Sequence, residues 1–196
     1  MDSRKTDIKN HTRILNTLTS SVEKQLLRWL AERVPPWVTP DMLTIFGVFG
    51  AFVVFIGYTL CNLHPAYLWL ATLGFILNWF GDSLDGTLAR TRHIERPVYG
   101  FYVDHATDAF VEILLFLGLG LSPFVRFEIA CLALIGYFLL SILVYIRTSV
   151  RGEFTISYGR LGPTEARLIA IFGNILVFFF GNPQIKLFTI SLTVYD

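Results

Sequence analysis

The segment GDSLDGTLARTRHIERPVYGFYVDHATDAF, residues 81–110, joins two strongly apolar stretches of the chain. PAYLWLATLGFILNWF ends directly before it at residue 80, and VEILLFLGLGLSPF begins directly after it at residue 111. This junction segment carries four aspartates, at positions 82, 85, 104 and 108. Because carboxylates close to a bilayer are energetically costly, acidic residues at such a place indicate a functional site.

The composition of the whole chain predicts an integral membrane protein. Of its 196 residues, 54% are hydrophobic and only 16% are charged, and the mean hydropathy is +0.56. A soluble domain of this length carries more charge. The formal net charge of +1 provides no global field that would favour binding to nucleic acid.

Five segments approach the roughly 20 residues that an α-helix needs to cross a bilayer. The sequence therefore predicts an all-α, polytopic membrane helix bundle with spans at residues 42–61, 66–84, 101–121, 127–146 and 164–181. The tail QIKLFTISLTVYD, residues 184–196, is apolar at its start but too short to span. Either the tail forms a half-helix, or the sequence stops before a sixth span.

An amphipathic helix is predicted before the first span, in SSVEKQLLRWLAERVPPWVTP, residues 20–40. Apolar residues recur there at helical spacing opposite charged ones, with Ser20 or Ser21 as the cap and Pro35-Pro36 as the end. We expect this helix to lie in the membrane interface; the alternative is a helix packed only on protein. The predicted organisation is a cytoplasmic N-terminal segment at 1–40 and a transmembrane domain at 41–196.

The distribution of Lys and Arg predicts the orientation of the chain in the membrane. Of the 16 basic residues, only Arg126 and Lys186 lie on the side opposite the N-terminus, which leaves 16 − 2 = 14 on the N-terminal side. Because basic loops stay in the cytoplasm, we expect the N-terminus and the junction segment on the cytoplasmic side. The expected location is a bacterial inner (cytoplasmic) membrane.

The four aspartates of the junction segment are expected to converge. Asp82 and Asp85 are at positions i and i+3 of one predicted helix, and Asp104 and Asp108 are at i and i+4 of the next. Pro97 lies in the connection, which turns the chain so that the two helices become antiparallel neighbours. Four negative charges at one depth repel strongly, and a divalent metal removes that repulsion.

The chemistry around the aspartates indicates phosphoryl transfer. Hard oxygen ligands favour one or two Mg²⁺ or Mn²⁺ ions, which commonly also bind substrate phosphate oxygens. Gly86, Ala89 and Gly100 leave the helix surfaces bare, so that a ligand can approach closely. The guanidinium of Arg90 can bind a phosphate with two parallel hydrogen bonds.

These residues together resemble the signature of the CDP-alcohol phosphotransferases (CDP-alcohol phosphatidyltransferases), integral membrane enzymes of phospholipid synthesis. Every position is filled in the pattern Asp82-x2-Asp85-Gly86-x2-Ala89-Arg90-x9-Gly100-x3-Asp104-x3-Asp108. TPDMLT, residues 39–44, resembles the nucleotide-contacting segment of the family, so the likeness covers most of the chain. The resemblance implies six transmembrane helices and a homodimer; the short tail departs from the first of these.

The resemblance also implies a reaction and a role for each residue. A hydroxyl acceptor attacks the β-phosphorus of a CDP-alcohol and CMP leaves, with one of the two substrates being a lipid. Asp82, Asp85 and Asp104 would bind metal, while Asp108 would approach the metal and act as the general base that takes the acceptor proton. The nucleotide would lie against Gly86, Ala89, Arg90 and Gly100, with Pro40, Asp41 and Thr44 on its other side.

Several other polar residues have two interpretations each. The pair Asp104-His105 resembles the corresponding pair of the eukaryotic choline and ethanolamine phosphotransferases, in which case His105 would assist the base Asp108. A purely structural role for His105 fits the sequence equally well. Arg147 and Arg151 would hold an anionic acceptor or simply anchor the helix at the cytoplasmic face. Glu165 would cap the last span, with Thr164 as a second cap, or contact substrate.

Two other classes of protein fit parts of this pattern. An aspartate-rich membrane prenyltransferase also binds a diphosphate through Mg²⁺, but it needs more spans than this chain offers. A cation channel or transporter places acids along a path, whereas these acids are expected at one membrane face with nothing comparable deeper. Cys61 and Cys131 have no metal-ligand spacing and are interpreted as packing residues.

Overall fold

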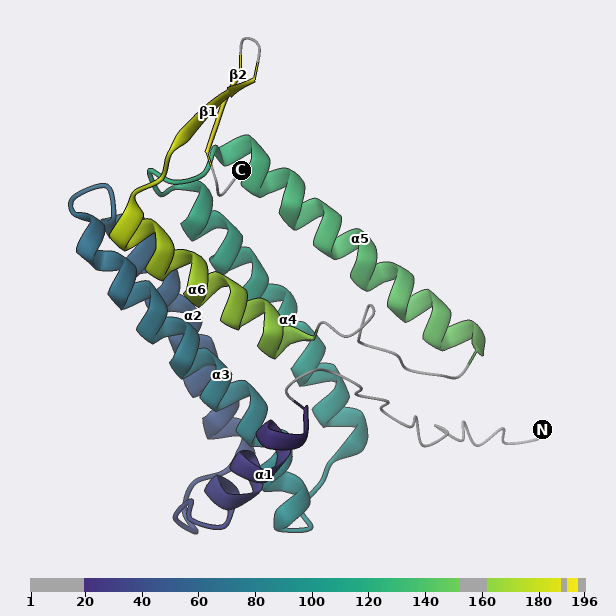
Figure 1. The fold of residues 1–196 in the computed structure, drawn as a ribbon. Helices are drawn as coiled ribbons and strands as arrows, with labels where there is room; N and C mark the ends of the chain where they lie inside the picture. The colour runs from purple at the N-terminus through teal and green to yellow at the C-terminus, as the bar shows by residue number, and fades with distance from the viewer. Residues whose placement is uncertain (1–19, 152–161, 188–189, 194–196) are drawn as a thin grey trace.

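The structure, a computed structural model, describes residues 20–151, 162–187 and 190–193 (Figure 1). Most of the described residues are helical, which confirms the predicted class of a polytopic helical membrane protein. The elements are α1 (Ser20–Ala31), α2 (Pro40–Leu60), the short 3₁₀ helix η1 (Pro65–Tyr67), α3 (Leu68–Thr91), α4 (Pro97–Gly120), α5 (Phe127–Arg151), α6 (Pro163–Phe180), β1 (Gln184–Leu187) and β2 (Ile190–Thr193).

The five long helices α2 to α6 occupy the positions of the five predicted spans. Three segments of the described chain are long and apolar enough to cross a membrane by length and composition: Pro40–Leu60, Phe127–Ile146 and Pro163–Phe180. The other two helices, α3 and α4, contain the aspartates of the junction segment. Figure 1 shows α5 set to one side of the bundle, where it packs mainly on α4.

Glycines bring α2 and α3 into very close contact. A Cβ atom at Gly50 would lie 2.3 Å from the backbone nitrogen of Asn78, and one at Gly81 would lie 2.3 Å from the backbone nitrogen of Gly47. Backbones can approach this closely only where no side chain intervenes, as at small-residue interfaces between membrane helices. This contact aligns α3, which carries Asp82, against the N-terminal half of α2.

A substitution at this contact provides the first test. Because the atoms opposite Gly50 are backbone atoms that cannot rotate away, Gly50→Ala should lower the free energy of unfolding by about 1–3 kcal/mol, the usual cost of overpacking. Gly136→Ala is the matched control, since a Cβ at Gly136 in α5 meets nothing within 4 Å. Thermal unfolding in detergent should show a loss for the first variant alone; equal melting temperatures would contradict the close packing.

A buried chain of polar side chains joins α2, α3 and α6 in the other half of the bundle. The Tyr58 hydroxyl donates to Oδ1 of Asn174 at 2.9 Å, and Nδ2 of Asn174 donates to the hydroxyl of Thr72 at 3.2 Å. All three side chains are buried. Because each polar group is paired, this network fixes α6 against α2 and α3 without leaving unsatisfied donors in an apolar interior.

The amphipathic helix α1 begins at Ser20 and ends at Ala31, four residues before Pro35. Leu27 and Ala31 are buried in a cluster with residues of α2 and α3. A second apolar group, Val22, Leu26 and Trp29, is exposed at 70%, 43% and 51%. One side of α1 therefore packs on protein, and the exposed apolar side is what the predicted interfacial position requires.

At the start of α6, the structure confirms one of the two expected caps and contradicts the other. The Glu165 carboxylate accepts a hydrogen bond from the Gly162 amide at 2.9 Å and so caps the N-terminus of α6. Thr164 is not a cap, because its hydroxyl instead donates to Glu23 of α1 at 2.6 Å. The capping interpretation of Glu165 is thus confirmed, and that of Thr164 is wrong.

The tail does not form the half-helix considered from its sequence. Strands β1 and β2 pair antiparallel, with Gln184 opposite Thr193 and Leu187 opposite Ile190. The segment alternates apolar and polar residues and is rich in β-branched ones, which favours strands over a helix. The Thr193 hydroxyl donates to the carbonyl of Phe124 at 2.7 Å and ties the hairpin to the loop before α5.

Candidate metal and active site

Three of the four aspartates of the junction segment converge. Asp82 of α3 and Asp104 and Asp108 of α4 each offer a carboxylate oxygen, and these oxygens all lie within 4.8 Å of one another. Two carboxylates at that distance repel by roughly 3 kcal/mol at an effective dielectric constant of about 20. The group is half-buried, so its charge is only partly screened by water and suits a divalent cation.

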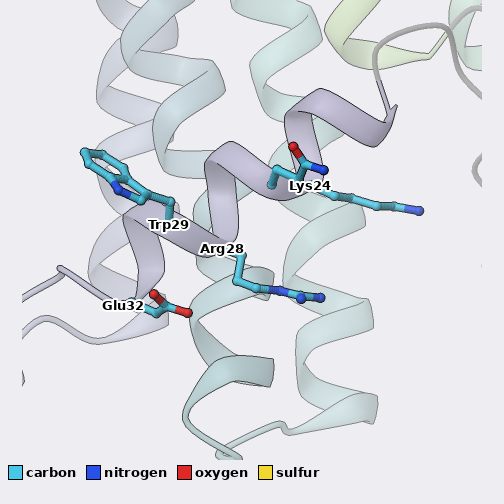
Figure 2. A pocket seen from close by; sticks show the side chains of 5 residues that line it. Lys24, Arg28, Trp29 and Glu32 are labelled. Atoms are coloured by element: carbon cyan, nitrogen blue, oxygen red, sulfur yellow. The ribbon is translucent and has the colours of Figure 1, made fainter.

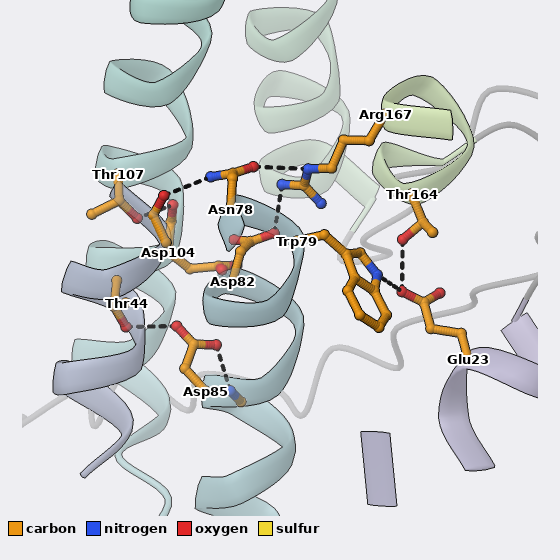
Figure 3. A network of polar contacts seen from close by, with 12 residues as sticks. Glu23, Thr44, Asn78, Trp79, Asp82, Asp85, Asp104, Thr107, Thr164 and Arg167 are labelled. Carbon is orange, nitrogen blue, oxygen red and sulfur yellow. Dashed lines mark hydrogen bonds and ion pairs between the residues drawn. The ribbon is translucent and has the colours of Figure 1, made fainter. Parts of the chain in front are cut away.

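Asp85, the fourth aspartate, does not belong to this group of three. Its carboxylate accepts a hydrogen bond from the Thr44 hydroxyl of α2 at 2.6 Å (Figure 3). Asp85 is still close enough to Asp82 and Asp104 to interact with them electrostatically. The structure therefore places Asp85 beside the cluster, and it places Thr44, expected at the nucleotide, against Asp85.

An arginine from α6 contacts the cluster, as Figure 3 shows. Nη2 of Arg167 donates to Oδ2 of Asp82 at 2.7 Å, and its Nε donates to Oδ1 of Asn78 at 2.9 Å. Asn78 in turn donates to the carbonyl of Gly47 in α2 at 3.0 Å. Sequence reasoning had counted Arg167 only as a basic residue for orientation. The missed signal was an arginine inside a predicted membrane span, because a charge at such a place requires a partner.

A further acid lies deeper than the cluster and corrects the expectation that nothing comparable does. Glu112 is one helical turn beyond Asp108 on α4, and its carboxylate accepts a hydrogen bond from Tyr137 of α5. It also interacts electrostatically with Arg167 and Asp82. Sequence reasoning missed Glu112 because it stands outside the pattern of the junction segment, although its i+4 spacing from Asp108 was visible.

The predicted bare surfaces lie beside the cluster. A Cβ at Gly100 would meet nothing within 4 Å, and one at Gly86 would meet only the guanidinium end of Arg90, at 3.3 Å from Nη1. Arg90 is exposed and its Nη2 donates to the Thr87 hydroxyl one turn earlier, at 3.1 Å. Ala89 is half-buried on the same helix. The surroundings of both glycines leave room for a ligand where the C-terminal part of α3 meets the N-terminal part of α4.

The start of α2 faces the connection between α3 and α4. Thr39 caps the helix by accepting a hydrogen bond from the Met42 amide at 3.3 Å, and Pro40 occupies the first helical position. Asp41 forms an ion pair with Arg96, which stands directly before α4. The segment expected to contact nucleotide therefore borders the same end of the bundle as the glycines.

His105 is adjacent to the cluster. Its Nδ1 lies 2.8 Å from the carbonyl oxygen of Phe101 and 3.7 Å from Oδ2 of Asp104. The imidazole stacks on the Phe101 ring with centroids 4.1 Å apart, and the Tyr145 ring is 5.2 Å away. A tautomer in which Nδ1 donates to the carbonyl leaves Nε2 as the basic nitrogen.

Helix α1 is attached to the two helices that carry Asp82 and Arg167. The Glu23 carboxylate accepts hydrogen bonds from the Trp79 indole at 2.9 Å and from the Thr164 hydroxyl at 2.6 Å (Figure 3). The arrangement joins α1 to α3 and to the N-terminal end of α6. Neither Glu23 nor Trp79 had been singled out from the sequence.

A shallow pocket occurs on α1 itself, on the outside of the bundle (Figure 2). Its lining consists of Lys24, Gln25, Arg28, Trp29 and Glu32. No aspartate of the cluster and no predicted nucleotide contact belongs to it, so it is separate from the site described above. Arg147 and Arg151 lie in the last turns of α5, and their side chains are outside the described part of the structure.

Cys61 and Cys131 are both free thiols, as expected of packing residues. Cys61 is buried, and its thiol donates to the Gly57 carbonyl at 3.2 Å. Cys131 is half-buried in α5. Neither thiol contributes to the aspartate cluster.

Comparison with known proteins adds an independent observation. The family model of the CDP-alcohol phosphatidyltransferases matches residues 37–195. A CDP-diacylglycerol–serine O-phosphatidyltransferase of Encephalitozoon cuniculi is 30% identical over 168 residues, which cover 79% of this chain and 41% of the relative. An archaetidylinositol phosphate synthase of Pyrococcus horikoshii is 29% identical over 136 residues, covering 69% and 68%. Cholinephosphotransferase 1 of Danio rerio is 26% identical over 163 residues, covering 78% and 41%.

Proposed function

The chain belongs to the CDP-alcohol phosphatidyltransferase family, and on that basis we propose that it transfers a substituted phosphate group from a CDP-alcohol to a hydroxyl acceptor, with release of CMP. The observation that carries this proposal is the convergence of carboxylate oxygens from Asp82, Asp104 and Asp108 within 4.8 Å. The family match also favours this reaction over prenyl transfer and cation transport.

The aspartates are proposed to hold one or two Mg²⁺ or Mn²⁺ ions. Asp82, Asp104 and Asp108 would be ligands, and Asp85 would join them from its position beside the cluster. A metal bound there supplies positive charge that neutralises the phosphate oxygens and the leaving CMP. Oxygen ligands alone, with no thiol or imidazole in the group, suit these hard cations.

Asp108 is proposed as the general base. It would accept the proton of the acceptor hydroxyl, whose oxygen then forms a bond to the β-phosphorus while the bond to CMP breaks. Asp108 lies one helical turn further along α4 than Asp104, so an acceptor alcohol that approaches from the membrane would meet it before Asp104. His105, one turn nearer the cytoplasm, lies beside the cluster and is the alternative base.

The proposed nucleotide site lies at the cytoplasmic ends of α2, α3 and α4. The surroundings of Gly86 and Gly100 provide room for the nucleotide. The exposed guanidinium of Arg90 provides N–H groups that can donate hydrogen bonds to a phosphate. The residues proposed to contact the nucleotide are Gly86, Ala89, Arg90, Gly100, Pro40, Asp41 and Thr44. Three of them have side-chain contacts in this structure: Thr44 with Asp85, Asp41 with Arg96, and Arg90 with Thr87.

The membrane setting is also part of the proposal. Residues 1–40 would be a cytoplasmic segment and 41–196 the transmembrane domain, with the active site on the cytoplasmic side of a bacterial inner membrane. A homodimer is proposed because α5 leaves large apolar side chains exposed, including Leu132, Leu139 and Leu143. Either lipid or a second copy of the chain must cover them.

Cysteine labelling tests the orientation. Glu95 is exposed in the connection between α3 and α4, so Glu95→Cys should react with an impermeant maleimide only from the cytoplasmic side. Leu63→Cys is the opposite-side control, because Leu63 is 76% exposed in the connection between α2 and α3. The unaltered chain, with Cys61 buried and Cys131 half-buried, gives the background. Reaction of Glu95→Cys from outside would invert the topology.

Turnover of the purified protein tests the reaction itself. The panel combines CDP-diacylglycerol with small hydroxyl acceptors, and small CDP-alcohols with diacylglycerol, because either substrate can be the lipid. We expect one combination to release CMP only when donor and acceptor are both present. Absence of CMP release from every combination would contradict the proposed function, and release without acceptor would indicate hydrolysis instead of transfer.

A further inference from the structure

Arg167 forms hydrogen bonds with two side chains of α3 through two neighbouring nitrogens of its guanidinium. Its Nε and Nη2 donate to Asn78 at 2.9 Å and to Asp82 at 2.7 Å. Asn78 and Asp82 are one turn apart, so a planar donor pair fits both acceptors. The amide of Asn78 is itself held by the Gly47 carbonyl at 3.0 Å. This set of contacts fixes the orientation of Asp82, a member of the aspartate cluster.

The third nitrogen of the same guanidinium is in a different situation. Nη1 of Arg167 is buried and has no hydrogen-bond partner among the residues that the structure describes. The whole side chain is only 11% exposed. A buried N–H donor without an acceptor costs free energy, and an acceptor atom supplied by a bound ligand would remove that cost.

The charges around Arg167 identify the chemical class of that acceptor. The guanidinium interacts electrostatically with Asp82, Asp108 and Glu112. When a divalent cation enters the cluster, it competes with the guanidinium for the charge of Asp82, because two cations at one carboxylate repel each other. An arginine released in this way, with a vacant donor beside a metal, matches the bidentate geometry of a phosphate.

We propose that Arg167 is a positioning residue that neutralises Asp82 until the divalent metal binds, and that its buried guanidinium then binds a phosphate oxygen of the CDP-alcohol. This inference rests on the proposed function, since it requires both a metal and a diphosphate at the site. A purely structural clamp between α6 and α3 would instead affect folding without changing metal and nucleotide affinity in opposite directions.

The test measures binding rather than activity. Mn²⁺ binding is followed by electron paramagnetic resonance in detergent, and binding of CDP in the presence of Mg²⁺ by calorimetry. In Arg167→Gln the affinity for Mn²⁺ alone should rise about fivefold, because a competing cation has been removed. The affinity for CDP should fall about tenfold or more, because a charge-assisted donor has been lost.

Arg126→Gln is the matched control. Arg126 is an exposed arginine that pairs with Glu128 at 3.7 Å, away from the aspartates, so both affinities should equal those of the unaltered protein. If Arg167→Gln leaves both affinities unchanged, or weakens Mn²⁺ binding, the proposal is overturned.

Arg167→Lys keeps the proposal testable should the glutamine variant fail to fold. Lysine retains the charge but lacks the planar fork, so Mn²⁺ affinity should stay within about twofold while CDP binding falls about fivefold. Undiminished CDP binding in this variant would contradict the phosphate contact. If the unaltered protein binds neither Mn²⁺ nor CDP, the proposed function fails. If it binds both, and the Arg167 variants bind them equally well, only the role proposed for Arg167 is refuted.

Discussion

Asp108→Asn is expected to lower turnover by at least ~100-fold, a typical contribution of general-base catalysis. The amide cannot accept the proton of the acceptor hydroxyl, although its single carbonyl oxygen can still approach the metal. Binding of the CDP-alcohol should survive, because the proposed nucleotide contacts come from other residues, such as Gly86 and Arg90. CMP release measures the turnover, and calorimetry or thermal shift with Mg²⁺ and CDP-alcohol measures the binding.

Asparagine at the other three aspartates provides the comparison. Asp82, Asp85 and Asp104 are proposed only as metal ligands, so their loss of charge should weaken metal affinity as well as rate. Asp104→Asn is the closest match to Asp108→Asn, since Asp104 and Asp108 both belong to the aspartate cluster and both lie on α4. Near-normal turnover in Asp108→Asn would show that Asp108 is not the base, and His105 would then be tested first.

Chelation of divalent metal is expected to abolish CMP release altogether. The oxygens of Asp82, Asp104 and Asp108 lie within 4.8 Å of one another, and Arg167 pairs with only one of these residues. Without a metal, the remaining negative charge repels the phosphate oxygens of the donor. EDTA should therefore eliminate activity in the CMP-release assay, and excess Mg²⁺ or Mn²⁺ should restore it.

The control for chelation is EDTA already saturated with Mg²⁺, which should leave activity unchanged. Circular dichroism during the same titration distinguishes loss of metal from loss of fold, since the helices should persist. Full activity in excess free EDTA would remove the metal from the mechanism and leave the aspartate cluster without its proposed role.

Much of the fold was readable from local sequence. The apolar runs near the length of a bilayer predicted the positions of α2 to α6, because hydrophobicity and helix length are properties of contiguous residues. The tail was the exception among the elements: the four residues of β1 and the four of β2 pair as strands, and apolarity alone does not distinguish that outcome from a half-helix.

The convergence of the aspartates was also predictable, because their spacing follows helical periodicity on both sides of a short connection. Asp82, Asp104 and Asp108 needed only the two helices to be antiparallel in order to meet. The separation of Asp85 from that group could not be predicted. It depends on the Thr44 hydroxyl, which comes from another helix 41 positions away in the chain.

The sequence by itself thus determined the helical membrane class and the junction segment with its acidic residues, since these depend on composition and on spacing within one or two helices. Only the tertiary structure decided which distant side chains complete the site. Arg167 reaches Asp82 across 85 positions of sequence because α6 packs directly on α3. Contacts of that kind depend on how helices pack, and packing depends on the shapes of surfaces that adjoin one another only after folding.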